Sequence, residues 1–330
     1  MNLIRNFFSS IIGSLLTLTL GFLIITFSIT LVIFDSKFIL STFEKNNTYE
    51  VLATEVIPKV LVFAIAQQAE EQNPDQSVAE KLTQKLDKTT FEKLSPDLKK
   101  IFENSYAFVV GEKEQFEVRL ELQSYLPTLQ ENLSAAVSSL QTEGQLQGLN
   151  VEELTANLQE ANQASLLITQ DKIEVSGIKE LNTTQNQDQN DKSFLRQARL
   201  ALQRIKESQS ILIVTTVLLA VILFATRLPH FLSGFKWIAS TGISATFLPL
   251  IFGFLALITK PVGMVSGFLK EQEGVATFSS AVDLISKNLE TITNKIFVNI
   301  LTISLTLMAV SIALYILVFF LQKRQTKAQT

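Results

Sequence analysis

Four long stretches of the chain contain no charged side chain, and they dominate its pattern of apolar and polar positions. They run over Asn6–Phe34, Ser208–Thr226, Trp237–Thr259 and Ile296–Gln322, with lengths of 29, 19, 23 and 27 residues. A helix of about 20 apolar residues crosses roughly 30 Å of hydrocarbon at 1.5 Å per residue. Each stretch is long enough for this and is flanked by charged residues. The pattern therefore predicts four transmembrane helices.

We interpret the first stretch as an uncleaved signal anchor rather than as a cleaved signal peptide. Arg5 provides the short basic segment that both kinds of sequence carry. A signal peptide has an apolar region of only about 7–15 residues and ends in small residues at its cleavage site. Here the apolar run is about twice that length. The run is followed by charged residues within Val32–Lys37, and this segment contains no cleavage site of small residues.

The spans divide an integral membrane protein, predicted to be mainly α-helical, into eight segments. In chain order these are transmembrane helix 1 (6–34), an extracytoplasmic domain (35–192), a stalk plus transmembrane helix 2 (193–226), a cytoplasmic loop (227–236), transmembrane helix 3 (237–259), an extracytoplasmic loop with an amphipathic helix (260–295), transmembrane helix 4 (296–322) and a cytoplasmic tail (323–330).

The distribution of charge predicts the orientation. If the N-terminus is cytoplasmic, the inner segments 1–5, 227–236 and 323–330 hold six basic residues and no acidic one. The outer segments 35–207 and 260–295 then hold all 31 acidic residues. The positive-inside rule favours this arrangement, with both termini in the cytoplasm and the chain in the plasma membrane of the cell. Basic residues near the outer end of the second span argue against it: Lys192, Arg196, Arg199, Arg204 and Lys206.

Apolar residues at helical spacing predict that the outer domain is mostly helical. Val78, Leu82 and Leu86 recur every four residues after Ser77. Glu80 stands three residues beyond that serine, as in a capping box, so Ser77 is predicted to cap this helix.

A second helix is predicted to begin at Ser95, with this serine as N-cap, Pro96 in the first turn and Asp97 favourable to the helix dipole. Its predicted inner face consists of Leu98, Phe102 and Val109. Gly111 is predicted to end it in a left-handed conformation. The Asn-x-x-Glu pattern at 150–153 predicts the start of a further short helix.

Two segments of the outer domain depart from the helical pattern. Phe116–Leu122 alternates strictly between apolar and polar residues, which is typical of a half-buried strand. Leu166–Thr169 and Lys172–Val175 are its predicted partners, so we expect a small β element. Asn182–Lys192 contains no apolar side chain, which predicts an exposed linker or loop.

Two of the membrane helices are predicted to extend beyond the bilayer. Ser193–Leu228 contains neither Gly nor Pro, so one helix of about 34 residues, roughly 50 Å long, is expected there. Before the fourth span, one helical face is predicted to be apolar: Phe278, Val282, Ile285, Leu289 and Ile292. Such extensions pack on each other, or they support the large domain. Alternatively, 278–292 lies flat on the lipid surface.

The composition agrees with a membrane protein and shows how the charge is divided. Charged residues make up 18% of the chain, against about 25% in soluble domains. Residues 35–191 carry 26 acidic and 13 basic side chains, whereas 192–207 carry one acidic and five basic. A strongly acidic surface attracts cations or basic partners, but we interpret this one as a solvated face.

Residues that carry common catalytic chemistry are scarce. Cysteine is absent, which excludes disulfides, thiolate zinc sites and cysteine nucleophiles. His230 is the single histidine, and the chain has neither a Gly-Lys dipeptide nor a G-x-G-x-x-G motif. A serine–lysine dyad has no motif to support it. The basic cluster 192–207 lacks the interleaved aromatic residues of a nucleic-acid site. The sequence predicts no catalytic, cofactor-binding or metal-ligating residue, no cofactor and no nucleic-acid partner.

The polar residues of the spans are interpreted as structural. Gly242-Ile243-Ser244 is similar to part of an intramembrane serine protease, but no span holds a histidine to act as base. We therefore expect Ser240, Gly242 and Ser244 to let helices approach closely. Pro249 predicts a kink. No span contains the ionisable residue that marks an ion pathway. The hydroxyls of the first span are expected to bond to backbone or to a neighbouring helix: Thr17, Thr19, Thr26, Ser28 and Thr30.

Two segments carry a resemblance to known proteins. They are Phe34-Asp35…Tyr49-Glu50, just after the first span, and Leu94-Ser95-Pro96…Tyr106…Gly111. On these residues the chain resembles uncharacterised bacterial four-transmembrane proteins with a helical extracytoplasmic domain, a resemblance that implies no activity. The order of one span, a large outer domain and three spans also resembles the permease subunits of MacB/FtsX-type systems. The short inner loop 227–236 lacks their coupling segment.

Two functions from different classes follow. The first is a non-enzymatic protein of the cell envelope, anchored in the lipid bilayer. Its outer domain would bind or scaffold another envelope protein, a wall component or a ligand. The second is a permease-like subunit of an ABC-type transport or mechanotransmission system, which works with a separate ATPase. The neighbouring genes and the proteins that copurify with the chain distinguish the two.

Overall fold

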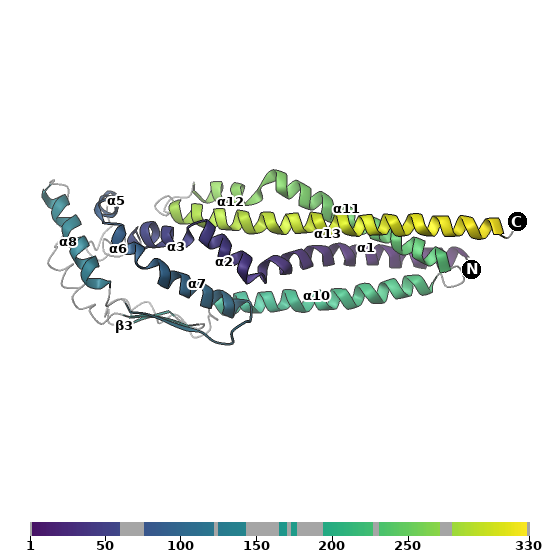
Figure 1. The fold of residues 1–330 in the computed structure, drawn as a ribbon, viewed down its shortest axis with the longest axis horizontal. Helices are drawn as coiled ribbons and strands as arrows, with labels where there is room; N and C mark the ends of the chain where they lie inside the picture. Colours follow the sequence, from purple (N-terminus) through teal and green to yellow (C-terminus); the bar gives the residue numbers. More distant parts are fainter. Residues whose placement is uncertain are drawn as a thin grey trace. The chain divides into compact units, whose positions relative to one another are not determined.

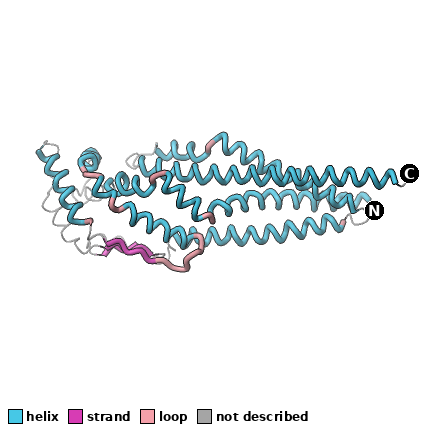
Figure 2. Tube along the Cα trace, viewed as in Figure 1, coloured by secondary structure: helices cyan, strands magenta, loops and turns pink. Residues whose placement is uncertain are grey.

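The computed structural model describes residues 2–59, 76–121, 125–142, 165–169, 173–176, 194–226, 231–270 and 279–328. Among these residues the chain is mainly helical, with one small sheet (Figure 2). The chain forms two compact units. Unit 1 comprises Met1–Ile39, Leu202–Met264 and Leu289–Thr330, and unit 2 comprises Leu40–Ala201 and Val265–Asn288.

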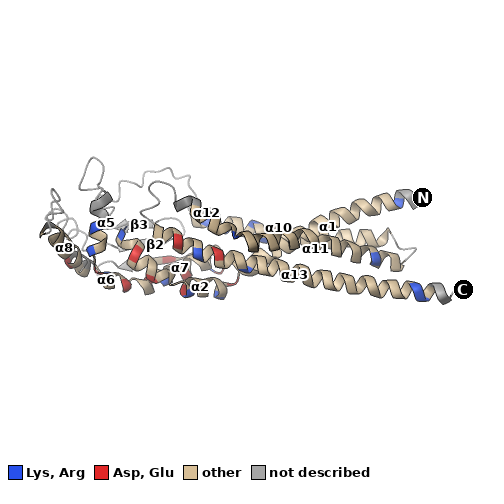
Figure 3. Ribbon diagram, turned by 90° about the horizontal axis from the view of Figure 1, so that it is seen from above, with Lys and Arg blue, Asp and Glu red and all other residues tan. Residues whose placement is uncertain are grey.

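Four helices among the described residues are long and apolar enough to cross a membrane, as many as the spans that the sequence predicts. They are α1 (Asn2–Ile33), α10 (Phe194–Ala225), α11 (Phe231–Thr259) and α13 (Ser279–Ala328). Their apolar stretches appear as long uncharged segments in Figure 3. The chain is therefore a multi-pass membrane protein in its architecture.

Helix α11 begins at Phe231, so the last six residues of the predicted inner loop 227–236 are helical. The reason is a cluster of three phenylalanines. The rings of Phe231 and Phe235 pack edge to face with centroids 5.0 Å apart. Both also contact Phe224 of α10, at 5.2 Å and 5.1 Å. This packing extends the helix toward its N-terminus.

Small residues allow α11 to pack closely between α1 and α13 in unit 1. Helices α1 and α11 lie side by side (Figure 1). A Cβ at Gly21 would lie 3.6 Å from the carbonyl oxygen of Ala245, and one at Gly242 would overlap the hydroxyl of Ser311. In membranes, such close approach replaces the hydrophobic effect as the source of helix association. The buried residues of α11 are Gly234, Ala239, Thr241, Gly242, Ala245, Thr246, Pro249, Gly253 and Ala256.

The outer faces of the four long helices remain apolar and exposed. Phe22 of α1, Val214 of α10 and Leu248 of α11 are examples with well over half of the side chain accessible. Monomeric soluble proteins rarely expose apolar surface continuously over whole helices. A surrounding hydrocarbon phase accounts for these faces, as the sequence predicts.

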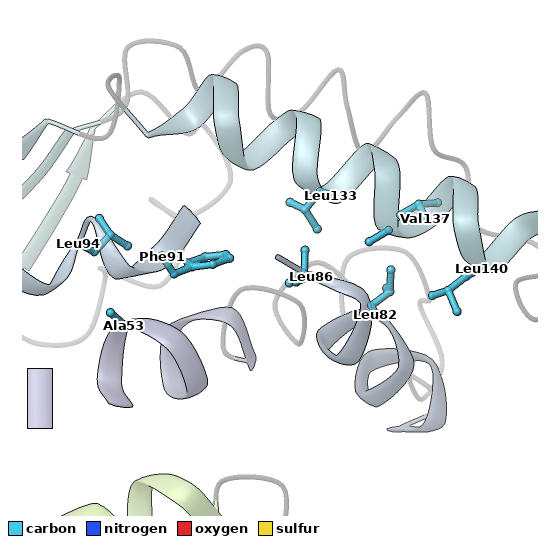
Figure 4. Packing of buried hydrophobic residues seen from close by; sticks show 9 residues of the cluster. Ala53, Leu82, Leu86, Phe91, Leu94, Leu133, Val137 and Leu140 are labelled. Carbon is cyan, nitrogen blue, oxygen red and sulfur yellow. The ribbon is translucent and has the colours of Figure 1, made fainter. Parts of the chain in front are cut away.

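Unit 2 has a hydrophobic core of its own. It is built from α3 (Thr48–Val51) with the π-helical turn η1 (Leu52–Val56), α5 (Gln76–Lys85), α6 (Thr89–Glu92), α7 (Ser95–Val109) and α8 (Leu126–Thr142). Figure 4 shows Leu133, Val137 and Leu140 of α8 pointing toward Leu82 and Leu86. Ala53 of η1, Phe91 and Leu94 complete the labelled cluster.

The predicted start of α7 at Ser95 and its predicted end are confirmed, but the predicted N-cap is wrong by one residue. Ser95 is already helical, because the preceding turn keeps right-handed geometry and Leu94 occupies the N-cap without a side-chain bond. At the other end Gly111 has φ 85°. The N–H groups of Gly111 and Glu112 donate to the carbonyls of Phe108 and Ala107, as in a Schellman motif.

Helix α5 begins at Gln76, so Ser77 lies inside the helix rather than at the predicted N-cap. The four-residue spacing behind that prediction is confirmed by the burial of Leu82 and Leu86 in the core. Three other expectations lie outside the described residues: the helix start at 150–153, the linker Asn182–Lys192 and the position of Phe278.

The predicted β element is confirmed as a three-stranded antiparallel sheet, β1 (Glu117–Glu121), β2 (Ser165–Thr169) and β3 (Ile173–Ser176). Val118 pairs with Ile168, and Leu166 pairs with Val175. Just before β1, Phe116 is buried and its ring contacts that of Phe108 at 5.6 Å. The sheet is thereby joined to the end of α7.

Two further helices connect these elements. Asp35 precedes α2 (Ser36–Lys45), and its carboxylate accepts the N–H of Phe38 at 3.0 Å, as an N-cap. After α11, Lys260 adopts a left-handed φ of 45°. Pro261 then begins α12 (Pro261–Lys270). The chain changes direction sharply at Lys260. The ammonium of this residue lies 3.6 Å from a carboxylate oxygen of Glu290 on α13.

Helices α10 and α13 both contribute to the two units without a break. Helix α10 is continuous from Phe194 to Ala225, as the lack of Gly and Pro predicts. Helix α13 is 50 residues long and begins at Ser279. Ile285 of its predicted apolar face is 57% exposed, whereas Leu284 and Asn288 are buried, so the apolar face is not the face that packs on the protein. The alternative that this face lies on lipid stays a prediction. The buried face is set by hydrogen-bonding partners in unit 2, described below.

Candidate functional site

The hydroxyls of α1 bond to their own helix, as the sequence predicts. Each donates to a carbonyl three or four residues earlier, at distances between 2.7 and 3.1 Å: Thr17, Thr19, Thr26, Ser28 and Thr30. A further hydroxyl, that of Ser9, lies 3.1 Å from that of Thr226. These hydroxyls are satisfied within the protein, so they need no polar pathway to account for them.

The small residues of α11 divide into two groups. Gly242 is buried against Ser311, as expected for close packing. Ser240 and Ser244, expected to do the same, are exposed. The buried small residues beside Gly242 are Thr241 and Ala245, one position away from the predicted serines. Ser244 therefore does not face another described helix.

A pocket of about 320 Å³ lies between the end of α1 and the facing turns of α10. We call it the α1–α10 pocket, and its lining residues are Thr30, Leu31, Phe34, Asp35, Lys206 and Gln209. The ammonium of Lys206 lies 5.7 Å from the centre of the Phe34 ring, within the range of a cation–π contact. The pocket thus combines an apolar wall with one cationic and one anionic side chain.

Arg199 joins α10 to the segment between α7 and β1. Its guanidinium donates to the carbonyl oxygens of Lys113 at 2.9 Å and Glu114 at 3.2 Å. The same group lies 4.7 Å from the centre of the Phe108 ring. One basic residue of the 192–206 cluster is therefore used inside unit 2, where it satisfies backbone carbonyls that follow the end of α7.

Asn288 joins α13 to the start of unit 2, and we call it with its partners the Asn288 cluster. Its side-chain nitrogen donates to the hydroxyl of Thr48 at 2.9 Å and to the carbonyl of Leu284 at 3.0 Å. Its oxygen accepts the side-chain N–H of Asn46 at 2.9 Å. Asn288 is 4% exposed. A buried amide that makes three hydrogen bonds fixes the rotation of its helix.

Tyr49 lies next to this cluster on α3. Its ring and that of Phe43 both contact Phe102 of α7, each at 5.6 Å. The hydroxyl of Tyr49 is buried and has no hydrogen-bond partner among the described residues. Burial, followed by the negative charges of Glu103 and Glu44, raises the pKa of Tyr49 to about 12. The phenol is therefore neutral at physiological pH.

An exposed ion-pair group on α2 and α7 includes the two carboxylates that raise the pKa of Tyr49. Lys99 of α7 forms a hydrogen-bonded ion pair with Glu44 of α2. This bond with Glu44 is the main reason that the pKa of Lys99 is raised, and Glu103 contributes with a carboxylate 3.9 Å away. Exposed pairs of this kind contribute little to stability. They indicate how α2 and α7 are oriented, but no reaction.

A cluster of side chains that could hold a metal ion is not found in the part of the chain that the structure describes. No three side chains among His, Asp and Glu gather closely enough there to hold a metal ion. His230 lies outside the described residues. The sequence predicted no site residue, and it also gave no sign of the α1–α10 pocket, whose lining comes from distant segments.

Comparison of the chain with protein-family models, with curated proteins and with solved structures finds no match.

Proposed function

We propose that the chain is a non-enzymatic binding or scaffold protein of the cell envelope that acts through unit 2 on the outer side of the plasma membrane. The observation that carries this proposal is that two apolar helices continue into unit 2 and are bonded there. Arg199 of α10 bonds to the loop after α7, and Asn288 of α13 bonds to Thr48. A domain held in this way at two helices is suited to present a surface at a membrane.

The use of basic side chains supports the orientation with both termini in the cytoplasm. The basic cluster near the outer end of the second span is the feature of the sequence that argues against this orientation. Arg199 is occupied by backbone carbonyls, and Lys206 lies over the Phe34 ring. Two of these charges thus have a structural role, which explains their presence on the outer side. The partner of unit 2 is proposed to be an envelope protein, a wall component or a ligand.

The second candidate is a permease-like subunit that works with a separate ATPase. The same continuous helices favour it, because a helix without a break transmits displacement along its axis. Helix α13, with 50 residues, is about 75 Å long at 1.5 Å per residue. In this function, motion driven on the cytoplasmic side would reach unit 2 through α10 and α13.

Photo-crosslinking from two positions distinguishes the functions. A photoreactive residue is placed at Ser138, exposed on α8, or at Gln325, exposed near the end of α13. The full-length chain is irradiated in intact cells and purified in mild detergent, and its adducts are identified by mass spectrometry. The scaffold function predicts a defined envelope adduct from Ser138 and none from Gln325. A stoichiometric ATPase adduct from Gln325 would contradict it and support the permease function.

A further inference from the structure

We infer that the α1–α10 pocket binds the headgroup of a glycerophospholipid that carries both a phosphate and a primary amine, as phosphatidylethanolamine does. The inference rests on the proposed membrane function and deepens it. The pocket lies where the apolar run of α1 ends, between Thr30 and Asp35. If α1 crosses the bilayer, this turn reaches the level of the lipid headgroups.

An apolar path leads from the hydrocarbon region to the pocket. Phe27, Leu31 and Phe34 follow one another at spacings of four and three residues on α1, so they share one face. Leu31 is 47% exposed. On α10, Ile213 is exposed and stands four residues beyond Gln209. An acyl chain that lies along these side chains would place its headgroup in the pocket.

The polar groups of the pocket match both charges of such a headgroup. The ammonium of Lys206 attracts the phosphate, and Gln209, three residues along the same helix face, offers an amide donor. Asp35 attracts the amine. One oxygen of Asp35 accepts the N–H of Phe38 at 3.0 Å, which holds the carboxylate in place.

Neither charge of the pocket is neutralised by another side chain within the described residues. No ion pair includes Asp35 or Lys206, and both are exposed. A phosphatidylglycerol headgroup would leave Asp35 without a cation, and a phosphatidylcholine headgroup cannot donate a hydrogen bond from its amine. The volume of about 320 Å³ is within the range of small-molecule sites, roughly 300–1,000 Å³.

Native mass spectrometry of the full-length chain tests the inference. The protein is purified in mild detergent, freed of lipid by detergent exchange and mixed with equal amounts of dioleoyl phosphatidylethanolamine, phosphatidylcholine and phosphatidylglycerol. We expect the first lipid to be bound roughly two- to fivefold more than either of the others, as a partly exposed charge pair allows. Equal binding of the three lipids would overturn the inference.

Three variants assign the preference to the pocket. Asp35→Asn keeps an N-cap of equal quality but removes the charge. The ratio of bound phosphatidylethanolamine to either other lipid should therefore fall to about one. Lys206→Gln should lower the binding of all three lipids. Arg204→Gln is the matched control, because Arg204 is an exposed basic residue of α10 that does not line the pocket. It should leave the preference unchanged.

The remaining outcomes are also decisive. A preference for phosphatidylglycerol that Arg204→Gln and Lys206→Gln reduce equally would show a diffuse basic surface and overturn the inference. If Lys206→Gln fails to fold, as judged by its circular dichroism melting curve, Asp35→Asn alone decides. Membrane fractionation of the same variants separates this inference from the proposed function. A chain that stays in the membrane without a lipid preference contradicts only the lipid site.

Discussion

At the scale of single residues, the buried phenol of Tyr49 gives a stability prediction. Its hydroxyl, which has no hydrogen-bond partner within the described ranges, carries a cost, since an unsatisfied buried polar group destabilises by about 1–3 kcal/mol. We expect Tyr49→Phe to raise the free energy of unfolding by about 1 kcal/mol, measured by urea titration with circular dichroism. Tyr125→Phe is the control with the opposite sign, because its hydroxyl donates to Asp97 at 2.7 Å. Shifts of the same sign in both variants would contradict the prediction.

The raised pKa of Tyr49 also predicts that the free energy of unfolding depends on pH in the alkaline range. Its pKa is about 12 in the folded protein, against an ordinary value of 10.0. As the pH rises through this interval, the unfolded chain loses the proton first, so the free energy of unfolding falls. Below the ordinary pKa the phenol makes no pH-dependent contribution. The stability difference between Tyr49→Phe and the wild type should therefore grow from about pH 10 to about pH 12. A constant difference would show that the phenol titrates normally.

At the scale of elements, neighbouring residues of α13 test which face of the helix is buried. Leu284 is 6% exposed and Ile285 is 57% exposed. Leu284→Asp should destabilise unit 2 by about 3–5 kcal/mol, as burial of an unpaired charge does. Ile285→Asp should change stability by less than about 0.5 kcal/mol. Limited proteolysis of unit 2 measures the difference. If Ile285→Asp were the more destabilising of the two, the apolar face with Ile285 would be the buried face of α13.

The close approach of α11 and α13 gives a second prediction at this scale. A methyl group at Gly242 would overlap Ser311, whereas one at Gly263 of α12 meets nothing within 4 Å. Gly242→Ala should therefore destabilise the helix bundle by about 1–3 kcal/mol, the usual cost of overpacking. Gly263→Ala should be neutral or stabilise by up to about 1 kcal/mol through helix propensity. Melting curves in detergent, followed by Trp237 fluorescence, compare the two.

The elements show what the sequence could and could not predict. The apolar helices and the strands follow from the chain itself, since a run without charge suits a hydrocarbon phase and strict alternation suits a half-buried strand. The N-cap prediction for Ser95 was wrong because the preceding turn keeps right-handed geometry and Leu94 takes the N-cap position, a tertiary effect. The buried face of α13 could not be predicted from apolar spacing, because Asn288 makes three hydrogen bonds and is buried while Ile285 is exposed. The pocket of Asp35 and Lys206 joins distant segments and leaves no local pattern.

At the scale of the whole molecule, the orientation is open to a direct test. Ser138 and Gln325 are both exposed, and the chain has no cysteine of its own. Single cysteines at these positions should react with a membrane-impermeant maleimide from opposite sides, with only Ser138→Cys labelled in intact cells. Gln325→Cys should react after the cells are opened, which serves as the control for reactivity. Labelling of Gln325→Cys alone in intact cells would reverse the orientation.

The Asn288 cluster sets the order in which the newly made chain can mature. Asn288 bonds to Asn46 and Thr48, which precede it by 242 and 240 residues. A ribosome adds about 5–20 residues per second, so these two side chains wait roughly 12–50 s for their partner. Until then they are hydrated, and neither unit has all of its segments. A polypeptide released before Asn288 therefore lacks the bonds that complete unit 2, and it is exposed to the proteases that remove unfinished membrane proteins.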